Sequence, residues 1–212
     1  MIFRLDERIL FPDPNLAEND GLLAVGGDLS VERLLLAYKN GIFPWYSNDT
    51  PILWYSPDER FVLYPWQLKI SKSMLQVMRS GKFLVTFNTA FADVIKACAD
   101  AERQEQNGTW ITSDMQQAYI NLNHLGYAHS VEVWLDGQLA GGLYGVKTGR
   151  VFCGESMFTK VSNASKLALI TLCHTNNYDL IDCQVHTNHL ETLGAAMISR
   201  AEYLKMLHQQ NP

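Results

Sequence analysis

The fold is decided by the stretch SVEVWLDGQLAGGLYGVKTGRVFCGESMF, residues 130–158. Three strand-like runs in it are separated by Asp136-Gly137 and by the triplet KTG at 147–149. Asp-Gly is a preferred pair for a two-residue hairpin turn, and a short loop containing glycine can make the same reversal. The stretch therefore predicts an antiparallel meander of three neighbouring strands.

The segments after the meander complete a mixed fold. Residues 163–176 have a helical pattern, LIDCQV at 180–185 has the composition of a buried strand, and 199–209 form a last helix. Ser199 and Glu202 have the spacing of a capping box for that helix. A meander followed by helix, strand and helix predicts the α+β class with a central, mostly antiparallel sheet. The order is compatible with an acyltransferase-like sheet but does not prove one.

Before the meander, the amino-acid composition of the chain changes near residue 65. Residues 1–65 are rich in turns and aromatic side chains, and 30–41 predict a short helix with Ser30 as N-cap and Gly41 just past its end. We expect a small N-terminal α+β subdomain over 1–65 and a larger domain over 66–212.

Three helices and a strand are expected between residue 66 and the meander. The first helix is capped by Ser71 and ends at Gly81, and the strand at 83–88 is followed by a helix over 90–100. Ser113 and Gln116 are spaced as a capping box for the third helix.

The composition is that of an ordinary globular protein. The chain has 212 residues, of which 47% are hydrophobic and 18% charged. It contains no apolar run of the roughly 18 residues that suggest a membrane span, and its start is unlike a signal peptide. A formal charge of -5 disfavours indiscriminate nucleic-acid binding but is compatible with a local basic patch.

The four cysteines, at positions 98, 153, 173 and 183, lack the spacing of a disulfide framework. This predicts buried thiols in a reducing cytoplasm.

Two carboxylates stand among apolar neighbours, Glu155 in the meander and Asp182 in the strand LIDCQV. Alternation along a strand places Glu155 on one face with Val151 and Cys153. A buried carboxylate is costly unless it is paired. The residues leave two explanations open: each acid caps a backbone turn or pairs with a buried Lys or Arg, or the two acids bind a cationic ligand.

Other kinds of chemistry have weaker support. Ser156 lacks the second glycine of a nucleophile elbow, and neither Cys153 nor Cys183 lies in a thiol-enzyme pattern. Cys183, His186 and His189 have metal-like spacing, but no second ligand pair accompanies them. The glycines match neither phosphate-binding nor dinucleotide loops, and the pyrophosphate loop of acetyl-CoA enzymes is missing, so no cofactor is expected.

Aromatic and basic side chains gather in two places. Loop aromatics are either core residues between subdomains or platforms on which bases stack. The basic cluster is either a solvated helix face or a phosphate-binding surface. The aromatics are Phe43, Trp45, Tyr46, Trp54, Tyr55 and Trp110, and the cations are Lys69, Lys72, Arg79 and Lys82.

Taken together, the motifs resemble a known family. They are GLLAVGGDLS, GIFPWYS, PILWYSPD, GTWIT, HSVEVW, GGLYGV, FCGESMF, NASKLAL and LIDCQV, in that order. This ordered series covers nearly the whole chain and is similar to that of the bacterial leucyl/phenylalanyl-tRNA–protein transferases.

The resemblance implies a small N-terminal domain joined to a GNAT-like catalytic domain. It implies an aminoacyltransferase that moves Leu or Phe, and possibly Met, from aminoacyl-tRNA to proteins beginning with Arg or Lys, which marks them for degradation by the N-degron pathway. Glu155, Asp182 and Gln184 are then expected near the peptide's basic N-terminus. Glu155 and Asp182 would bind that terminus and Gln184 would position its amine, with Asp182 as general base the competing hypothesis.

The resemblance also assigns the binding residues. Trp45 and Trp110 are expected to contact the terminal adenosine of the tRNA. The aminoacyl side chain is expected in an apolar pocket formed by Leu143, Phe152, Met157, Leu169, Leu172 and Ile181.

Two alternatives remain open at this point. They are an acyl-CoA N-acyltransferase, and a non-enzymatic module that binds tRNA ends or basic protein N-termini. A cytoplasmic location without membrane association is expected.

Overall fold

The computed structural model describes residues 2–101 and 110–210, so the first two residues of the motif GTWIT lie outside it. Its larger sheet has the strand order β11-β5-β10-β9-β8-β7-β6. The strands of this sheet are β5 (Glu59–Leu63), β6 (Leu84–Phe87), β7 (Ala128–Leu135), β8 (Gln138–Thr148), β9 (Val151–Thr159), β10 (Leu180–Gln184) and β11 (Ala196–Ser199).

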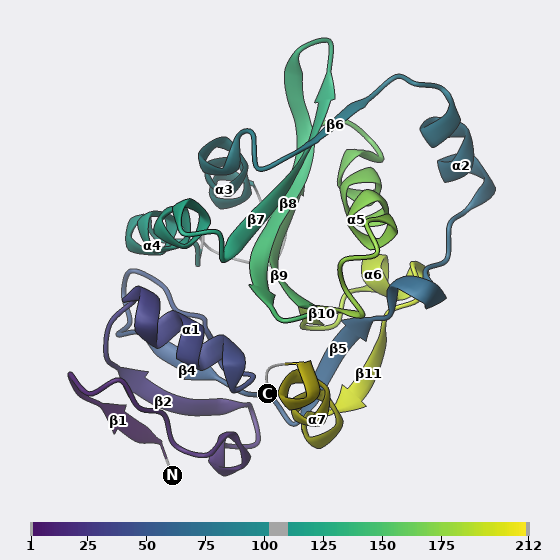
Figure 1. The fold of residues 1–212 in the computed structure, drawn as a ribbon. Helices are drawn as coiled ribbons and strands as arrows, with labels where there is room; N and C mark the ends of the chain where they lie inside the picture. Colours follow the sequence, from purple (N-terminus) through teal and green to yellow (C-terminus); the bar gives the residue numbers. More distant parts are fainter. Residues whose placement is uncertain (1, 102–109, 211–212) are drawn as a thin grey trace.

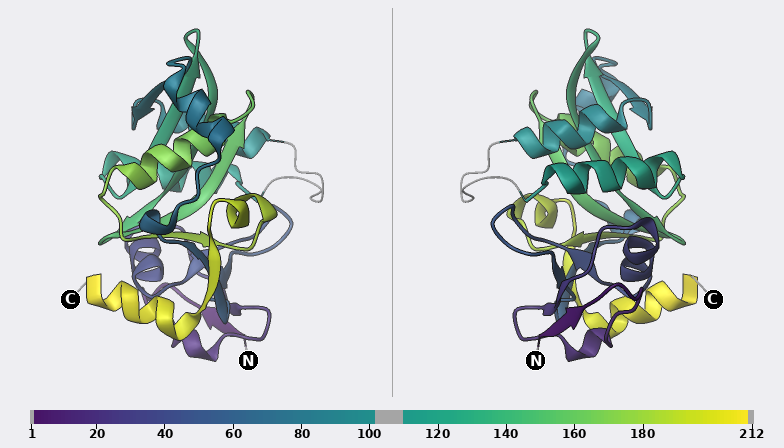
Figure 2. Two further views of the ribbon diagram at one scale, coloured as in Figure 1. Left: turned by 90° about the vertical axis from the view of Figure 1, so that its right-hand side faces the viewer. Right: turned by 90° about the vertical axis from the view of Figure 1, so that its left-hand side faces the viewer.

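Helices cover both faces of this sheet (Figures 1 and 2). One face packs against α3 (Phe91–Asp100) and α4 (Ser113–His124), and the other against α5 (Ala164–His174). The remaining helices of this part are α2 (Lys72–Arg79), α6 (Asn188–Thr192), α7 (Arg200–Gln210) and the short 3-10 helix η2 (Pro65–Gln67). The buried side chains between these layers form the core.

The predicted meander is confirmed. β7, β8 and β9 pair antiparallel in chain order, with Val131 opposite Leu143 and Leu143 opposite Met157. Asp136 and Gly137 have φ angles of 50° and 75°, and positive values at both central residues are those of a type I′ two-residue hairpin turn. The α+β class with a mostly antiparallel sheet is thereby confirmed as well.

The one parallel pair among the described strands of this sheet creates the site. β10 lies between β9, its parallel neighbour, and β5, its antiparallel neighbour. The pairing of β9 with β10 ends where Cys153 faces Asp182. Because parallel strands advance together, Glu155 and Gln184 each lie two residues beyond that last pair, where β9 and β10 are no longer paired.

The N-terminal residues form a smaller sheet of order β1-β2-β4-β3, with α1 packed nearby (Figure 1). Its elements are β1 (Phe3–Leu5), the 3-10 helix η1 (Pro14–Leu16), β2 (Leu22–Gly26), α1 (Val31–Lys39), β3 (Phe43–Pro44) and β4 (Leu53–Tyr55). Strand β5 pairs with the larger sheet, although its residues were expected in the N-terminal subdomain. Its apolar residues are buried against strands that are distant in the sequence, and the local sequence around β5 does not indicate that pairing.

The predicted helix caps are confirmed with one correction. The hydroxyls of Ser30, Ser71 and Ser199 each accept a hydrogen bond from the backbone N–H three residues ahead. For α4 the cap is Thr112 and not Ser113, because the Thr112 hydroxyl accepts the N–H three residues on at 3.2 Å. Ser113 is instead the first helical residue.

The cysteines and the helix lengths can be compared with what the sequence predicts. Cys98, Cys153 and Cys173 are buried free thiols and Cys183 is a half-buried one. Among the helices of residues 2–101 and 110–210, none combines the length and apolar character needed to cross a membrane.

Candidate active site

A cavity of about 510 Å³ opens beyond the last pair of β9 and β10. This volume lies in the usual range for small-ligand sites, roughly 300–1,000 Å³. Its walls come from β8, β9 and β10, from the segment around β3, and from the chain after β10. The residues that line it include Phe43, Trp45, Trp110, Tyr144, Glu155, Met157, Asp182, Gln184, His186 and Leu190.

Glu155 is the carboxylate at the centre of a polar network in this cavity. It is 7% exposed, and it accepts hydrogen bonds from the Tyr119 hydroxyl at 3.1 Å and from the Gln184 side-chain amide at 2.8 Å. Burial raises the pKa of the Glu155 carboxyl from 4.5 to about 7, and the hydrogen bonds of the network hold it from rising further. Near neutral pH the group therefore exchanges readily between its two charge states.

Two buried tyrosines extend the network into the N-terminal subdomain. Tyr38 of α1 and Tyr119 of α4 are hydrogen-bonded through their hydroxyls. Burial and the nearby Glu155 charge raise the pKa of each tyrosine well above its ordinary value. Both hydroxyls therefore keep their protons, and Tyr119 acts as a hydrogen-bond donor to Glu155.

Asp182 has a different environment, because its lone pairs are used inside the protein. The side chain is fully buried, and Arg60 bonds it through Nε to Oδ1 at 3.1 Å and through Nη2 to Oδ2 at 2.6 Å. The Gln184 backbone N–H donates to Oδ1 at 2.9 Å, and the Tyr203 hydroxyl donates to Oδ2 at 2.8 Å. A carboxylate has about four acceptor positions. Pairing with a buried arginine, one of the two explanations left open by the sequence, is the arrangement that Asp182 adopts.

Gln184 connects the two acids. Its backbone N–H is bonded to Asp182 and its side-chain amide to Glu155. The residue has a φ of 62°, a left-handed conformation that is uncommon for glutamine, and it follows an irregularity in the β5–β10 pairing. Such backbone strain persists where surrounding contacts enforce it, and it is frequent at functional sites. Because the Nε2 group is used by Glu155, the Oε1 atom remains the side-chain acceptor for another donor.

The two tryptophans assigned by resemblance both line this cavity. Trp45 is 39% exposed and has Tyr55 edge-on to it at 5.8 Å, while Trp110 is half-buried. Trp54 is a core residue instead, since it is fully buried and its indole N–H donates to the Gly26 carbonyl oxygen at 2.9 Å. The loop aromatics therefore divide between core and cavity.

The apolar wall contains most of the residues expected to hold the aminoacyl side chain. Leu143, Phe152, Met157, Leu169 and Ile181 all line the cavity. Leu172 is buried in the same apolar cluster but is absent from the cavity lining. Leu172 lies about one turn further along α5 than Leu169, and it packs in that cluster without reaching the cavity.

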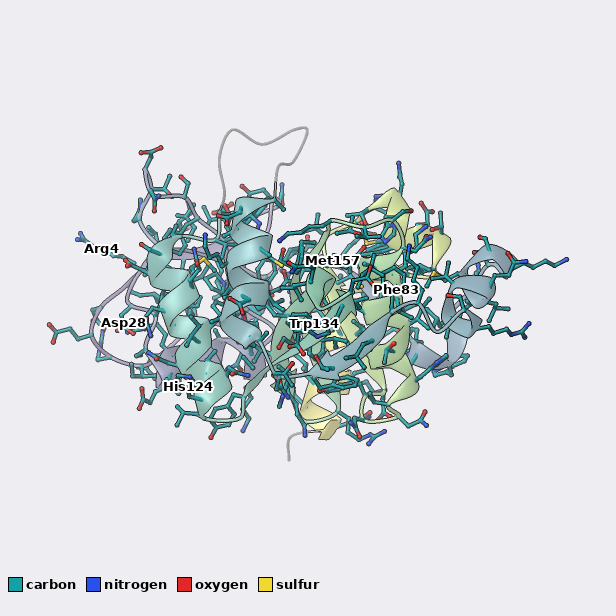
Figure 3. All side chains as sticks on the ribbon, turned by 90° about the horizontal axis from the view of Figure 1, so that it is seen from above. Arg4, Asp28, Phe83, His124, Trp134 and Met157 are labelled. Carbon is teal, nitrogen blue, oxygen red and sulfur yellow. The ribbon has the colours of Figure 1, made fainter. Side chains whose placement is uncertain are left out.

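The basic cluster lies apart from the cavity, on and around α2. Lys69, Lys72, Arg79 and Lys82 are all exposed. Figure 3 shows α2 at the outer end of the molecule with its long side chains extending away from the sheet. The four cations therefore form an exposed surface that a polyanion can reach.

The other candidate chemistries find little support in the geometry. Burial raises the pKa of the Cys153 thiol and of the Cys183 thiol well above the ordinary value, so neither is a ready thiolate. His186 lies 3.1 Å from Glu191. Within the described residues, no group of three or more His, Cys, Asp and Glu side chains is placed to hold a metal ion.

Sequence reasoning missed four residues of the polar network: Tyr38, Arg60, Tyr119 and Tyr203. Arg60 carried a usable signal, because this cation directly precedes the apolar run FVL of the strand ERFVL. The tyrosines carried none beyond the rule that a buried hydroxyl needs a partner.

Comparisons with known proteins agree with these features. The family model described as leucyl/phenylalanyl-tRNA protein transferase matches residues 62–208, and the model of its N-terminal domain matches residues 27–58. Among solved structures, a GCN5-related N-acetyltransferase from Kribbella flavida aligns over 75% of this chain and 57% of its own with a TM-score of 0.39 and 9% identity. That likeness is too distant to carry an inference.

Curated relatives extend the match to the full length. The leucyl/phenylalanyl-tRNA–protein transferase of Syntrophobacter fumaroxidans is 57% identical over 100% of this chain and 92% of its own. The protein of that name from Flavobacterium psychrophilum is 52% identical over 96% of this chain and 98% of its own. The chain therefore belongs to the leucyl/phenylalanyl-tRNA–protein transferase family.

Proposed function

We propose that this chain transfers leucine or phenylalanine from aminoacyl-tRNA to the α-amino group of proteins whose first residue is Arg or Lys. As a member of its family the chain is an aminoacyltransferase. The observation that carries the proposal is the cavity itself, which joins an apolar wall, two exposed or half-buried tryptophans and one available carboxylate. We further propose that it acts in the cytoplasm, marks its protein substrates for N-degron proteolysis and accepts Met-tRNA as a third donor.

The cavity lining contains groups suited to each of the two substrates. Tryptophan faces stack on bases, at about 1–3 kcal/mol for each base, so Trp45 and Trp110 are proposed to hold the terminal adenosine of the tRNA. The apolar wall then receives the aminoacyl side chain. Met157 in that wall has a flexible side chain, which helps one pocket to accept both a branched and an aromatic guest.

Glu155 and Gln184 are proposed to meet the protein's N-terminus. A basic first residue brings positive charge both on its side chain and on its α-ammonium group, and Glu155 is the carboxylate with acceptor capacity left for it. The α-amino group has a pKa of about 7.7–8.0. The pKa of Glu155, about 7, lies close enough for the carboxylate to take the ammonium proton. The Gln184 Oε1 atom accepts a hydrogen bond from the same amine and orients it.

The reaction then needs no cofactor and no covalent enzyme intermediate, because the aminoacyl ester is already activated. The neutral amine attacks the ester carbonyl carbon, and a C–N amide bond forms. The ester C–O bond breaks, the attacking nitrogen gives up one N–H proton, and the ribose oxygen takes up a proton, so that protons balance. Holding amine and carbonyl together in attacking geometry supplies up to about 7–11 kcal/mol of the barrier reduction.

In this scheme Asp182 is a positioning residue. Its oxygens are occupied by Arg60, Tyr203 and the Gln184 backbone, so it holds Gln184 in place and does not receive the proton. The competing hypothesis makes Asp182 the general base. The dependence of kcat/KM on pH, measured for Asp182→Asn and for Glu155→Gln, separates the two hypotheses. If the fall in kcat/KM at acidic pH disappears only in Glu155→Gln, Glu155 is the group that accepts the ammonium proton. If it disappears only in Asp182→Asn, that assignment is refuted.

The direct test of the reaction follows the mass of a peptide. Leucyl-tRNA and an Arg-initiated peptide are incubated with the protein, and a gain of one leucyl residue is expected. A Glu-initiated peptide of the same length is the matched control and should not react. If the Arg peptide binds without any mass change, the protein is a binding module. Binding of acetyl-CoA with transfer of its acetyl group would favour the acyl-CoA alternative.

A further inference from the structure

Arg60 contacts two residues that line the cavity, Phe43 and Asp182, without lining the cavity itself. It is on β5 and only 1% exposed, and its guanidinium carbon lies over the Phe43 ring at 4.7 Å and over the Tyr203 ring at 4.5 Å from the ring centres. Burial by itself would lower the pKa of Arg60, but the adjoining Asp182 carboxylate raises it well above its ordinary value. The residue is therefore a permanently charged group at the junction of β5, β10, α7 and the segment before β3.

One side of the guanidinium holds the tryptophan segment. Nη1 donates to the Gly41 carbonyl oxygen at 2.9 Å, and Phe43, stacked on the guanidinium, is two residues before Trp45. Gly41 has a φ of 69°, and a Cβ there would lie 2.7 Å from a methyl carbon of Leu204. The chain entering β3 is thus tightly fixed between Arg60 and α7.

The other side of the guanidinium holds the amine end. Nε and Nη2 bind the two oxygens of Asp182, and Asp182 in turn accepts the backbone N–H of Gln184. This last contact supports the left-handed conformation of Gln184, whose side chain meets Glu155. One planar cation therefore contacts the supports of both Trp45 and Gln184.

We infer that Arg60 is a positioning residue which sets the spacing between the tRNA-binding tryptophan and the amine-binding glutamine. The inference rests on the proposed function, because it assigns those two roles to Trp45 and Gln184. Arginine suits the task, since its rigid fork binds a carboxylate with two parallel hydrogen bonds while its faces stack on aromatic rings. Lysine retains the charge but offers neither the fork nor the flat faces.

A purely structural role for Arg60 makes a different prediction. If Arg60 only neutralised Asp182, its replacement would change stability and leave the rate constants of the folded enzyme intact. If it sets the spacing, its replacement affects both substrates: KM for the aminoacyl-tRNA rises and kcat falls. Asp182→Asn, which removes only the amine-side contact, should lower kcat and leave KM for the tRNA unchanged.

The experiment measures kcat and both KM values for the full-length wild type, Arg60→Lys, Asp182→Asn and the control Arg33→Lys. Arg33 is also fully buried, but it serves the N-terminal subdomain through Asp28 and the carbonyl oxygens of Asp6 and Arg8. For Arg60→Lys we expect kcat to fall about 10- to 100-fold, as for an ångström-scale misplacement. We expect KM for leucyl-tRNA to rise roughly 3- to 10-fold as stacking weakens. The Arg33 control should keep all three constants.

Every outcome decides between the two roles. Should Arg60→Lys not fold, the charge-neutral pair Arg60→Met with Asp182→Asn, which leaves no unpaired buried charge, takes its place. Wild-type constants in either folded variant overturn the inference, as does failure of both to fold, since Arg60 would then serve the fold alone. A wild type that transfers no leucyl group refutes the proposed function itself, which is a separate and distinguishable failure.

Discussion

Replacing Glu155 by glutamine should remove a specific pH dependence from the stability of this protein. The pKa of Glu155 is about 7 in the folded chain, raised from an ordinary value of 4.5 by burial. Between these two values the folded state keeps a proton that the unfolded state releases. The associated stability is fully present below pH 4.5 and is lost as pH rises through 7.

The size of the effect follows from the same two values. A difference of one pKa unit corresponds to 1.36 kcal/mol, so the full loss is roughly 3 kcal/mol, of which about 2.5 kcal/mol falls between pH 5 and pH 8.5. Glu155→Gln has no proton to lose. Hydrogen bonds weakened by the change shift its stability by a similar amount at every pH, so they leave the pH dependence untouched.

The assay is urea unfolding of wild type and Glu155→Gln at pH 5, 7 and 8.5. The unfolding free energy of the variant relative to wild type should increase by about 2.5 kcal/mol across the range. In thermal unfolding this corresponds to about 5–10 °C for a chain of this size. Glu59→Gln, at the exposed start of β5, is the matched control and should run parallel to wild type. Parallel curves for the Glu155 variant as well would show that the buried carboxyl does not hold its proton, and the proposed acid–base role would fall with that reasoning.

Three other outcomes are expected. Tyr119→Phe removes a hydrogen bond that favours the ionised form of Glu155, so the acidic limb of kcat/KM should move to higher pH; an unmoved limb would disconnect the tyrosine from the reacting carboxyl. Trp45→Ala should weaken binding of leucyl-tRNA by about 5- to 150-fold, the equivalent of losing one stacked base, and unchanged tRNA affinity would remove Trp45 from the donor site. Joint replacement of Lys72 and Arg79 by glutamine should make the dependence of log K for tRNA on log salt shallower by roughly one unit for each phosphate that is no longer neutralised, and an identical slope would place the tRNA backbone elsewhere.

The sequence predicted the parts of the fold that local signals define. Asp136-Gly137 favours one type of tight turn, which accounts for the hairpin between β7 and β8. Ser30, Ser71 and Ser199 each accept a hydrogen bond from a backbone N–H three residues ahead. These features depend only on residues that are close together in the sequence, so they could be predicted. Strand β5 and its pairing with β10 join residues more than one hundred positions apart. Hydrophobic pattern alone does not state which strand will be the neighbour.

The site was predictable to the same limited degree. Motif resemblance named residues that do gather around one cavity, except that Leu172 is buried in the same apolar cluster without lining the cavity. It was also silent on Arg60 and Tyr119, which reach the acids from distant elements. Partners of a buried side chain depend on tertiary packing, and spacing along the chain does not encode them.

Glu155 and Asp182 show why that distinction matters for function. Each is a single acid in an apolar strand, and each needs positive or hydrogen-bonding partners to be buried at all. Asp182 lies in the paired region of β10, where Arg60 of the neighbouring strand β5 lies beside it, so its oxygens are bonded within the protein. Glu155 lies two residues past the last pair of β9 and β10, where its hydrogen-bond donors Tyr119 and Gln184 are neutral and its charge remains free to change. The same sequence signal therefore has two outcomes, and the end of one parallel pairing decides which acid lies beside a buried arginine and which has only neutral hydrogen-bond donors.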